Sequence, residues 1–390
     1  MKLIFILVSI LVSTAVYSYP KFVGHGYNSC LICHYNSQGN GALTDYGRAL
    51  SATEISGKLF RPNLSDEELG ERSNFLRMKK PLSKSIRPSI NYRGLLFSQN
   101  VGDGDAVGDV WSDARYINMQ ISANVAIKLD QKDKYIVVAE MSYNPDDISD
   151  SSEDMRSREY YFRWMPNKNV VTYAGLMDKV FGVRFENHYL FSKRHLGLEH
   201  DDQSHAVTGV YQSEKTEFTG QYFLGNLHID GDTEQSGFSL KGVYKPSSFG
   251  RFGASFLSSS SPYKEKTFYS VHAEFGLGHG SSIITEFGQT LENQVISKLT
   301  KNGRYFSFQG AIRPLRGLYL YQTIEYLKSD LDSENYKMRL GPGLQWFVDQ
   351  GLEFRLDLLN ERSYSFPNPG EPGSSFNDQW ELLSQVHIWL

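Results

Sequence analysis

The residues with the clearest chemistry lie close together near the N-terminus of the 390-residue chain. Cys30, Leu31, Ile32, Cys33 and His34 form the pattern Cys-x-x-Cys-His, and the sequence contains no other cysteine. Two thiols at this spacing can form thioether bonds to the two vinyl groups on one edge of a porphyrin, and the adjacent imidazole can ligate the iron. The pattern therefore predicts one covalent c-type haem held by Cys30 and Cys33, with His34 as the proximal iron ligand.

Other chemistries of paired cysteines fit the sequence less well. A thioredoxin-like redox pair is expected within a strand–helix–strand unit, whereas Cys30 and Cys33 are flanked by Gly, Asn and Ser. A zinc site requires four ligands with a second Cys or His pair at a regular spacing. A local disulfide would leave His34 without a role. Haem attachment is the interpretation that uses all three residues.

The second axial iron ligand has several candidates, since cytochromes commonly use Met or His there. His25 lies five residues before Cys30, between two glycines that allow a tight backbone turn. Met78 lies near the end of an expected helix that begins with a capping box at Ser65 and Glu68. We predict His25 as the second iron ligand, with Met78 and an open or externally supplied position as alternatives.

The N-terminus has the features of an export signal. Lys2 precedes a short apolar run over residues 3–12, and Val16 and Ser18 are small enough for a cleavage site. We therefore predict a signal peptide over residues 1–18, with a retained membrane anchor as the alternative. Export agrees with haem attachment, because c-type haems are assembled outside the cytoplasm.

The composition narrows the class of protein. A formal net charge of −4 provides no basic footprint for nucleic acid. Twenty-four Tyr, 24 Phe, 5 Trp and 34 Gly suit an outer-membrane barrel, in which aromatic residues form girdles and glycines relieve crowding. The same composition also fits a secreted β-sandwich, so the decision rests on the strand pattern.

From about residue 84 the hydrophobic pattern has a period of two residues, which is typical of β-strands. One long run has apolar side chains at every second position, namely Ile117, Met119, Ile121, Ala123, Val125, Ile127 and Leu129. The chain also ends on such a run, with Trp380, Leu382, Val386, Ile388 and Leu390. Strand starts are expected near residues 86, 115, 133, 157, 169, 205, 216, 236, 251, 265, 281, 302, 316, 335, 350 and 377.

This count predicts an all-β transmembrane barrel of about 16 antiparallel strands over residues 84–390. A soluble sandwich would have shorter strands. Residues 19–83 are expected to form a small α-helical cytochrome c module, with Thr44 capping one of its helices.

One segment, residues 179–205, interrupts the strand pattern and contains four of the ten histidines. A loop of this length inside a compact domain usually has a function or is disordered. We expect it to line or narrow the lumen of the barrel. A solvated surface loop and a metal site are the alternatives.

Residues 22–30 and 43–50, including Tyr46, Gly47 and Arg48, resemble small c-type cytochrome modules of exported Gram-negative proteins. Some of these modules are joined to a porin-like barrel, and the whole chain resembles porin–cytochrome electron-conduit proteins. The resemblance implies an outer-membrane electron carrier, not an enzyme, with its haem module on the periplasmic side and its barrel in contact with lipid. It also implies a periplasmic or surface cytochrome partner, because one haem cannot alone bridge an apolar band of roughly 25 Å.

Two other functions stay open at this point. The protein could be a porin for small solutes whose haem is structural or sensory. It could also be a haem enzyme, if the position opposite His34 on the iron is open.

Overall fold

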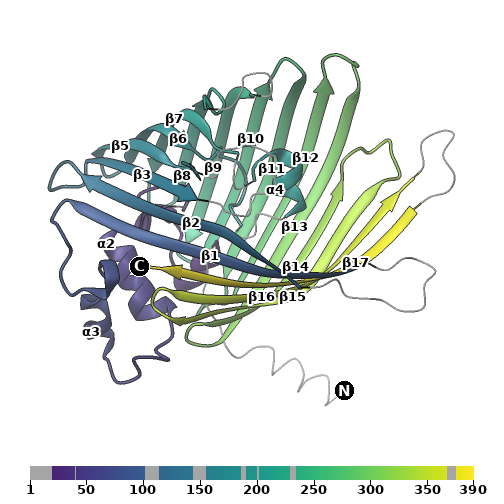
Figure 1. The fold of residues 1–390 in the computed structure, drawn as a ribbon. Coiled ribbons are helices and arrows are strands. Elements are labelled where there is room, and N and C mark those ends of the chain that lie inside the picture. Colours follow the sequence, from purple (N-terminus) through teal and green to yellow (C-terminus); the bar gives the residue numbers. More distant parts are fainter. Residues whose placement is uncertain are drawn as a thin grey trace.

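The computed structural model describes residues 20–39, 41–101, 114–143, 155–185, 190–199, 202–228, 234–366 and 375–390. The predicted signal peptide lies outside these residues. The chain forms one antiparallel β-barrel with short helices at one end of it (Figure 1). No helix of the described residues is long and apolar enough to cross a membrane.

Consecutive strands pair with each other, and β1 pairs with both β2 and β17, which closes the barrel. The strands are β1 (Ile86–Val101), β2 (Arg115–Lys128), β3 (Tyr135–Tyr143), β4 (Met155–Arg156), β5 (Tyr160–Asn167), β6 (Val170–Met177), β7 (Ser204–Gln212), β8 (Thr216–Phe223), β9 (Ser236–Ser247), β10 (Gly250–Ser260), β11 (Lys264–Gly276), β12 (Ser282–Gln294), β13 (Thr300–Leu315), β14 (Leu318–Lys328), β15 (Tyr336–Asp349), β16 (Leu352–Ser365) and β17 (Ser375–Trp389). The short β4 and β5 both pair with β3, so together they occupy one position and the barrel has 16 strands.

The predicted barrel is therefore confirmed, and each predicted strand start lies within three residues of an observed one. The alternation along the strands gives the barrel an apolar outer face and a polar inner face. On β2, for example, Ile121 is 42% exposed on the outside whereas Gln120 is 7% exposed on the inside. This arrangement of apolar and polar faces is that of barrels that span a membrane.

The N-terminal segment, residues 20–85, packs against one end of the barrel. Its helical turns are η1 (Pro20–His25), η2 (Cys30–Ile32), α2 (Asp45–Leu50), η3 (Ser51–Ile55), α3 (Asp66–Glu71) and η4 (Phe75–Arg77). Thr44 caps α2 and the capping box of Ser65 and Glu68 opens α3, as predicted, but α3 ends at Glu71.

The expected small α-helical module is not confirmed, because the N-terminal segment has only short helical turns and shares its apolar contacts with the barrel. Ile55 packs in one cluster with Tyr319 and Phe347, whereas Tyr35 and Ala42 belong to the largest cluster of the barrel interior. Short helical turns cannot bury enough apolar surface among themselves. The segment therefore folds as a plug of the barrel.

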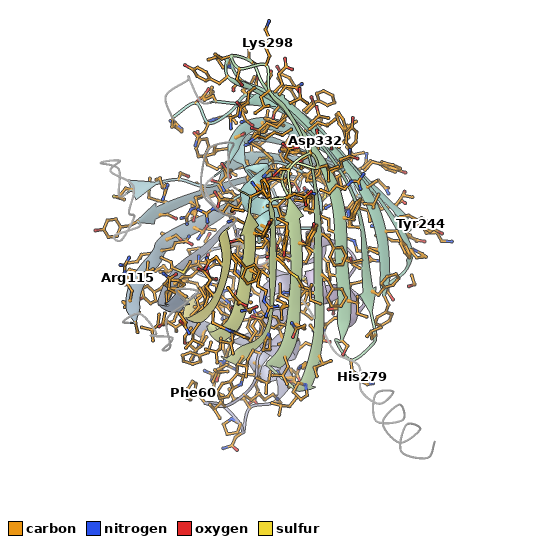
Figure 2. The ribbon with its side chains drawn as sticks, turned by 90° about the vertical axis from the view of Figure 1, so that its right-hand side faces the viewer. Phe60, Arg115, Tyr244, His279, Lys298 and Asp332 are labelled. Atoms are coloured by element: carbon orange, nitrogen blue, oxygen red, sulfur yellow. The ribbon has the colours of Figure 1, made fainter. Side chains whose placement is uncertain are left out.

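The plug lies at the end of the barrel where the strands are joined by short turns. Figure 2 shows Phe60 of the plug at the same end as His279 of a short turn, opposite Lys298 and Asp332. Ion pairs fix this position. The Arg61 guanidinium binds Asp349, with Nε 3.0 Å from Oδ1, and the Asp349 side chain is fully buried.

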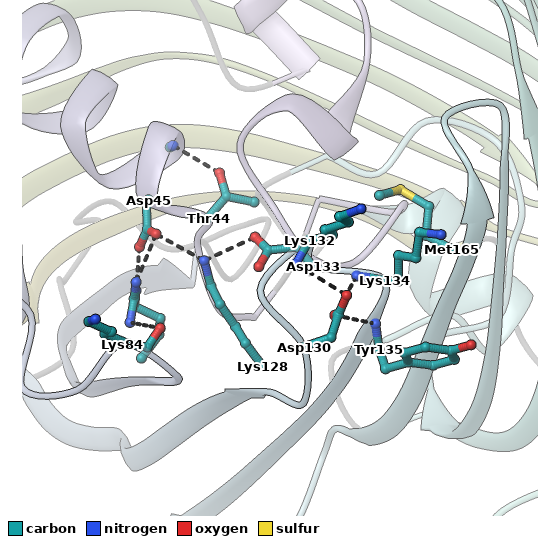
Figure 3. A network of polar contacts seen from close by, with 12 residues as sticks. Thr44, Asp45, Lys84, Lys128, Asp130, Lys132, Asp133, Lys134, Tyr135 and Met165 are labelled. Atoms are coloured by element: carbon teal, nitrogen blue, oxygen red, sulfur yellow. Dashed lines mark hydrogen bonds and ion pairs between the residues drawn. The ribbon is translucent and has the colours of Figure 1, made fainter.

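A second set of ion pairs joins α2 to the first strands (Figure 3). Asp45 accepts hydrogen bonds from Arg87, whose Nη2 is 2.9 Å from Oδ2, and from Lys128, whose Nζ is 3.0 Å away. Lys128 also pairs with Asp133 at 2.9 Å. The plug is therefore held by charges on strands at separate places around the rim.

The outward position of Ile121 generates a first prediction. Ile121→Arg places a charge in the apolar belt and should destabilise the barrel by roughly 2–4 kcal/mol, as a charge near the bilayer midplane does. Gln120→Arg is the matched control, because Gln120 faces the lumen and bonds Glu140. Urea unfolding in lipid vesicles measures both variants. Equal losses would show that the two faces are wrongly assigned.

A second prediction concerns the attachment of the plug. Arg61→Ala leaves the buried Asp349 without its cation, which should weaken docking by about 3 kcal/mol. Thermolysin should then cleave faster within residues 58–84. Lys79→Ala removes only the exposed pair with Glu71 and should change the cleavage rate little. Unchanged cleavage in Arg61→Ala would show that the pair does not hold the plug.

Candidate functional site

The lumen is narrowed from one side by the segment between β6 and β7, of which residues 178–185, 190–199 and 202–203 are described. This inward loop includes α4 (Phe191–Leu196), which lies within the barrel in Figure 1. Its backbone amides donate to side chains of the barrel wall: Gly182 to Ser255 at 3.0 Å, Val183 to Glu286 at 2.8 Å and Phe191 to Glu325 at 2.8 Å.

These bonds confirm that the loop lines the lumen, as predicted for residues 179–205. His188 and His200 lie outside the described residues. Within the described part of the chain no group of three or more His, Cys, Asp or Glu side chains is placed to hold a metal ion.

The Cys-x-x-Cys-His motif enters the lumen from the plug. Cys30 begins η2, and the His34 amide donates to the Cys30 carbonyl at 2.9 Å, which coils the motif tightly. Two contacts fix the chain just beyond it: Asn36 donates to the buried Glu159 at 2.8 Å, and the Tyr173 hydroxyl donates to the Tyr35 carbonyl at 3.1 Å. The motif is therefore held against the inner wall of the barrel.

The backbone of the motif is supported by α2. A side chain on Gly47 would come within 2.2 Å of the Cys33 carbonyl oxygen, so only glycine allows this approach. On either side of Gly47, Tyr46 and Arg48 reach away from the contact, to Tyr27 and to the Pro88 carbonyl. The Tyr-Gly-Arg sequence noted above thus has a packing reason.

Cys30, Cys33 and His34 all line one cavity of about 220 Å³ inside the barrel. Both cysteines are free thiols. Burial raises the pKa of both thiols, and that of Cys33 to about 12, so both are protonated at neutral pH. The structure therefore brings together the three residues that the sequence assigned to haem attachment.

The other walls of the cavity combine apolar and charged side chains. Apolar and aromatic surface comes from the plug and from the inward loop, through Phe22, Tyr27, Phe181, Val183 and Phe185. Charged side chains come both from the strands and from the inward loop. The strands contribute Arg93, Glu217, Lys241, Arg251, Glu274, Glu353 and Arg355, and the loop contributes Asp178, Lys179, Arg184, Lys193, Glu199 and Asp202.

This set of residues fits a c-type haem. The thiols and the imidazole are the groups that the covalent attachment requires, and the phenylalanines offer apolar surface to a porphyrin face. Arginine and lysine side chains on the same cavity, Arg251 and Lys241 among them, suit the two propionates of a haem. The cavity therefore has apolar side chains for the porphyrin ring and cationic side chains for the propionates.

His25 lies beside this cavity and is not among the residues that line it. It is buried between Phe22 and Tyr27, with ring centroids 5.8 and 5.9 Å away, and both neighbours line the cavity. Its Nδ1 is 2.6 Å from Glu54 Oε1. Burial lowers the pKa of His25 to about 4, against the effect of Glu54, so the imidazole is neutral at pH 7.

The bond to Glu54 places the proton of His25 on Nδ1 because the carboxylate can only accept. A carboxylate on one ring nitrogen is the usual orienting partner of a histidine that binds metal through the other nitrogen. Met78, the alternative ligand, follows η4 and, like His25, does not line the cavity; His25 differs because its ring neighbours Phe22 and Tyr27 line it.

Sequence reasoning missed the charged wall of the cavity. Glu217, Lys241, Arg251 and Glu274 lie on four successive strands, β8 to β11, and face inward. Arg251 binds Glu274 at 3.2 Å and lies 3.9 Å from Glu217. Charged residues at inward positions of the alternating pattern were the available signal, but their meeting depends on the strand register.

Comparisons with known proteins identify the fold. No family model matches the chain, and no curated protein matches it in sequence. Solved outer-membrane proteins match it in structure. OmpT of Vibrio cholerae has a TM-score of 0.59 at 9% identity, over 79% of this chain and 99% of that chain.

OprB of Pseudomonas putida has a TM-score of 0.58 at 10% identity, over 79% and 94% of the two chains. The anion-selective porin from Comamonas acidovorans has a TM-score of 0.57 at 8% identity, over 78% and 99%. Similarity at such identities concerns the fold. The chain therefore has a porin-like barrel.

Proposed function

We propose that this protein is an outer-membrane electron carrier of a Gram-negative bacterium that holds one covalent haem c in the lumen of its barrel. The observation that carries this proposal is the position of Cys30, Cys33 and His34, which face one internal cavity together with apolar and cationic side chains. The apolar outer face and the porin-like fold support the location in the outer membrane.

In this proposal Cys30 and Cys33 hold the porphyrin through thioether bonds and His34 binds the iron from one side. Bound haem would supply the chemistry of a one-electron couple between ferrous and ferric iron. The inward loop covers the cavity with Phe181, Val183 and Phe185, which keep water from the porphyrin. Lys241 and Arg251 would offer positive charge to the propionates beside their existing partners, the Gly182 carbonyl for Lys241 and Glu274 for Arg251.

The plug offers a connection from the cavity to the short-turn end, which is the periplasmic end in outer-membrane barrels. Tyr27 lines the cavity, and its hydroxyl lies 2.9 Å from that of Tyr46, which is 52% exposed. A periplasmic cytochrome at Tyr46 could therefore exchange electrons with the haem over a shorter distance than the full width of the membrane.

A porin for small solutes is the second candidate function, and the comparisons favour it. The structural neighbours include an anion-selective porin and the outer membrane channel DcaP of Acinetobacter baumannii. The inward loop would then act as the constriction of the channel, and the haem would have a structural or sensory role.

One experiment separates these two functions. Vesicles that contain the purified protein enclose an oxidised soluble cytochrome c, and ascorbate is added outside. We expect the enclosed cytochrome to be reduced by wild-type protein and not by the Cys30→Ser, Cys33→Ser variant, since the variant keeps the barrel and loses covalent haem. Peroxidase staining of a denaturing gel should show haem only in wild type.

Anomalous migration without boiling serves as the control that the double variant retains its barrel. Equal reduction by both proteins would mean that ascorbate passes through the lumen, and the solute-channel function would then replace electron transfer. A wild-type band without covalent haem would contradict the haem assignment itself.

We further propose that His25 is the second axial ligand, because Glu54 orients it and it lies beside the cavity. His25→Ala should open the iron and let the reduced protein bind carbon monoxide, as followed by the visible spectrum. Met78→Ala should leave the spectrum unchanged. If reduced wild-type protein binds carbon monoxide readily, the iron position opposite His34 is open. This result would contradict the His25 assignment and would favour a haem enzyme over an electron carrier.

A further inference from the structure

A second, smaller cavity of about 80 Å³ lies between the plug and the barrel wall at the short-turn end. The plug contributes Arg48 from α2 and Arg77 from η4, and the wall contributes Ser89 and Asn91 from β1 and Trp389 from β17. The remaining lining residues are Gly41, Leu43, Ser51, Ser73, Asn74, Gln350 and Leu390.

Two guanidinium groups line this cavity, and no carboxylate lines it beside them; the charges of Asp45 and Asp349 act on Arg48 and Arg77 from outside the cavity. Arg48 is 7% exposed, and its Nη2 donates to the Pro88 carbonyl at 2.8 Å. Arg77 donates in the same way to the Gln350 carbonyl at 2.8 Å. The Nε groups of both arginines are buried and have no hydrogen-bond partner among the described residues.

The described lining residues include no aspartate or glutamate. Buried cations are costly unless an anion and further hydrogen bonds compensate them. The hydroxyls of Ser51, Ser73 and Ser89 are further hydrogen-bond donors on the lining. The side-chain amides of Asn74 and Asn91 already donate to the Lys79 carbonyl and to the Ser122 hydroxyl, and each keeps a second N–H. The cavity thus offers many donors and two positive charges to a small guest.

We propose that this cavity binds a phosphate-type oxyanion, which bridges Arg48 and Arg77 and joins the plug to the barrel. Guanidinium groups bind phosphate oxygens through charge-assisted and often bidentate hydrogen bonds. Free inorganic phosphate and the headgroup of a phospholipid share this chemistry. The proposal is independent of haem, because neither arginine lines the larger cavity.

The test uses the purified full-length protein in phosphate-free detergent solution, titrated calorimetrically with inorganic phosphate. We expect saturable binding that Arg48→Gln and Arg77→Gln each weaken at least about tenfold. Arg72→Gln is the matched control, since Arg72 is exposed on the same segment and does not line the cavity. Equal weakening in all three variants, or no change in any, would overturn the site.

Parallel titrations with short-chain phosphatidylglycerol identify the source of the anion. Binding of the lipid alone assigns the site to a headgroup, binding of phosphate alone assigns it to the free ion, and binding of neither overturns the proposal. The fluorescence of Trp389, recorded in protein whose other four tryptophans are replaced by phenylalanine, gives a local readout that remains informative if a variant binds weakly. Unboiled gel migration confirms that each variant retains a folded barrel.

Discussion

The size of the barrel is the constraint on which the rest of the structure depends. Sixteen strands enclose a lumen wider than their own inward side chains can fill, as the water-filled channels of 16- to 18-stranded porins show. Such a lumen leaves room for other parts of the chain to enter. Here the plug enters from the short-turn end and the inward loop folds in between β6 and β7. The candidate site is the space left between these two parts of the chain.

The polar inner face of the barrel determines how the plug and the inward loop are held. Both inserts share apolar clusters with the wall, and hydrogen bonds and ion pairs to buried wall residues fix them in addition. Glu159 binds Asn36 of the plug, and Glu286 and Glu325 bind backbone amides of the inward loop. The charges that make the lumen polar also position the groups that face the cavity. Substitutions of the wall are therefore expected to act on the site through its inserts.

The strands could be predicted from the sequence because a membrane barrel repeats one simple pattern, apolar outside and polar inside, with a period of two residues. The same pattern identified Ile121 and Gln120 as residues of opposite faces. The Cys-x-x-Cys-His motif was also visible, because its chemistry depends on local spacing alone. The interruption between β4 and β5 was not visible, since the two pieces differ only in where they pair along β3.

Contacts between distant residues could not be predicted. His25 and Glu54 are 29 residues apart, and Asn36 and Glu159 are 123 apart. Such pairs depend on how the plug docks, which the strand pattern does not specify. For the same reason a small α-helical module was expected, whereas the structure has short helical turns that pack against the barrel. The local sequence of a short helix does not show that its apolar side chains will pack against strands that lie further along the chain.

The plug and the inward loop affect the passage of solutes and the transfer of electrons in different ways. A solute requires a continuous water-filled path, and each insert narrows that path. An electron requires only a bound redox group close enough to its partners, and an insert that surrounds the group with protein improves its shielding from water. The plug brings Cys30 and Cys33 inward and leaves Tyr46 exposed at the short-turn end. The features that impede a solute are thus the ones that would position a haem between the two sides of a membrane.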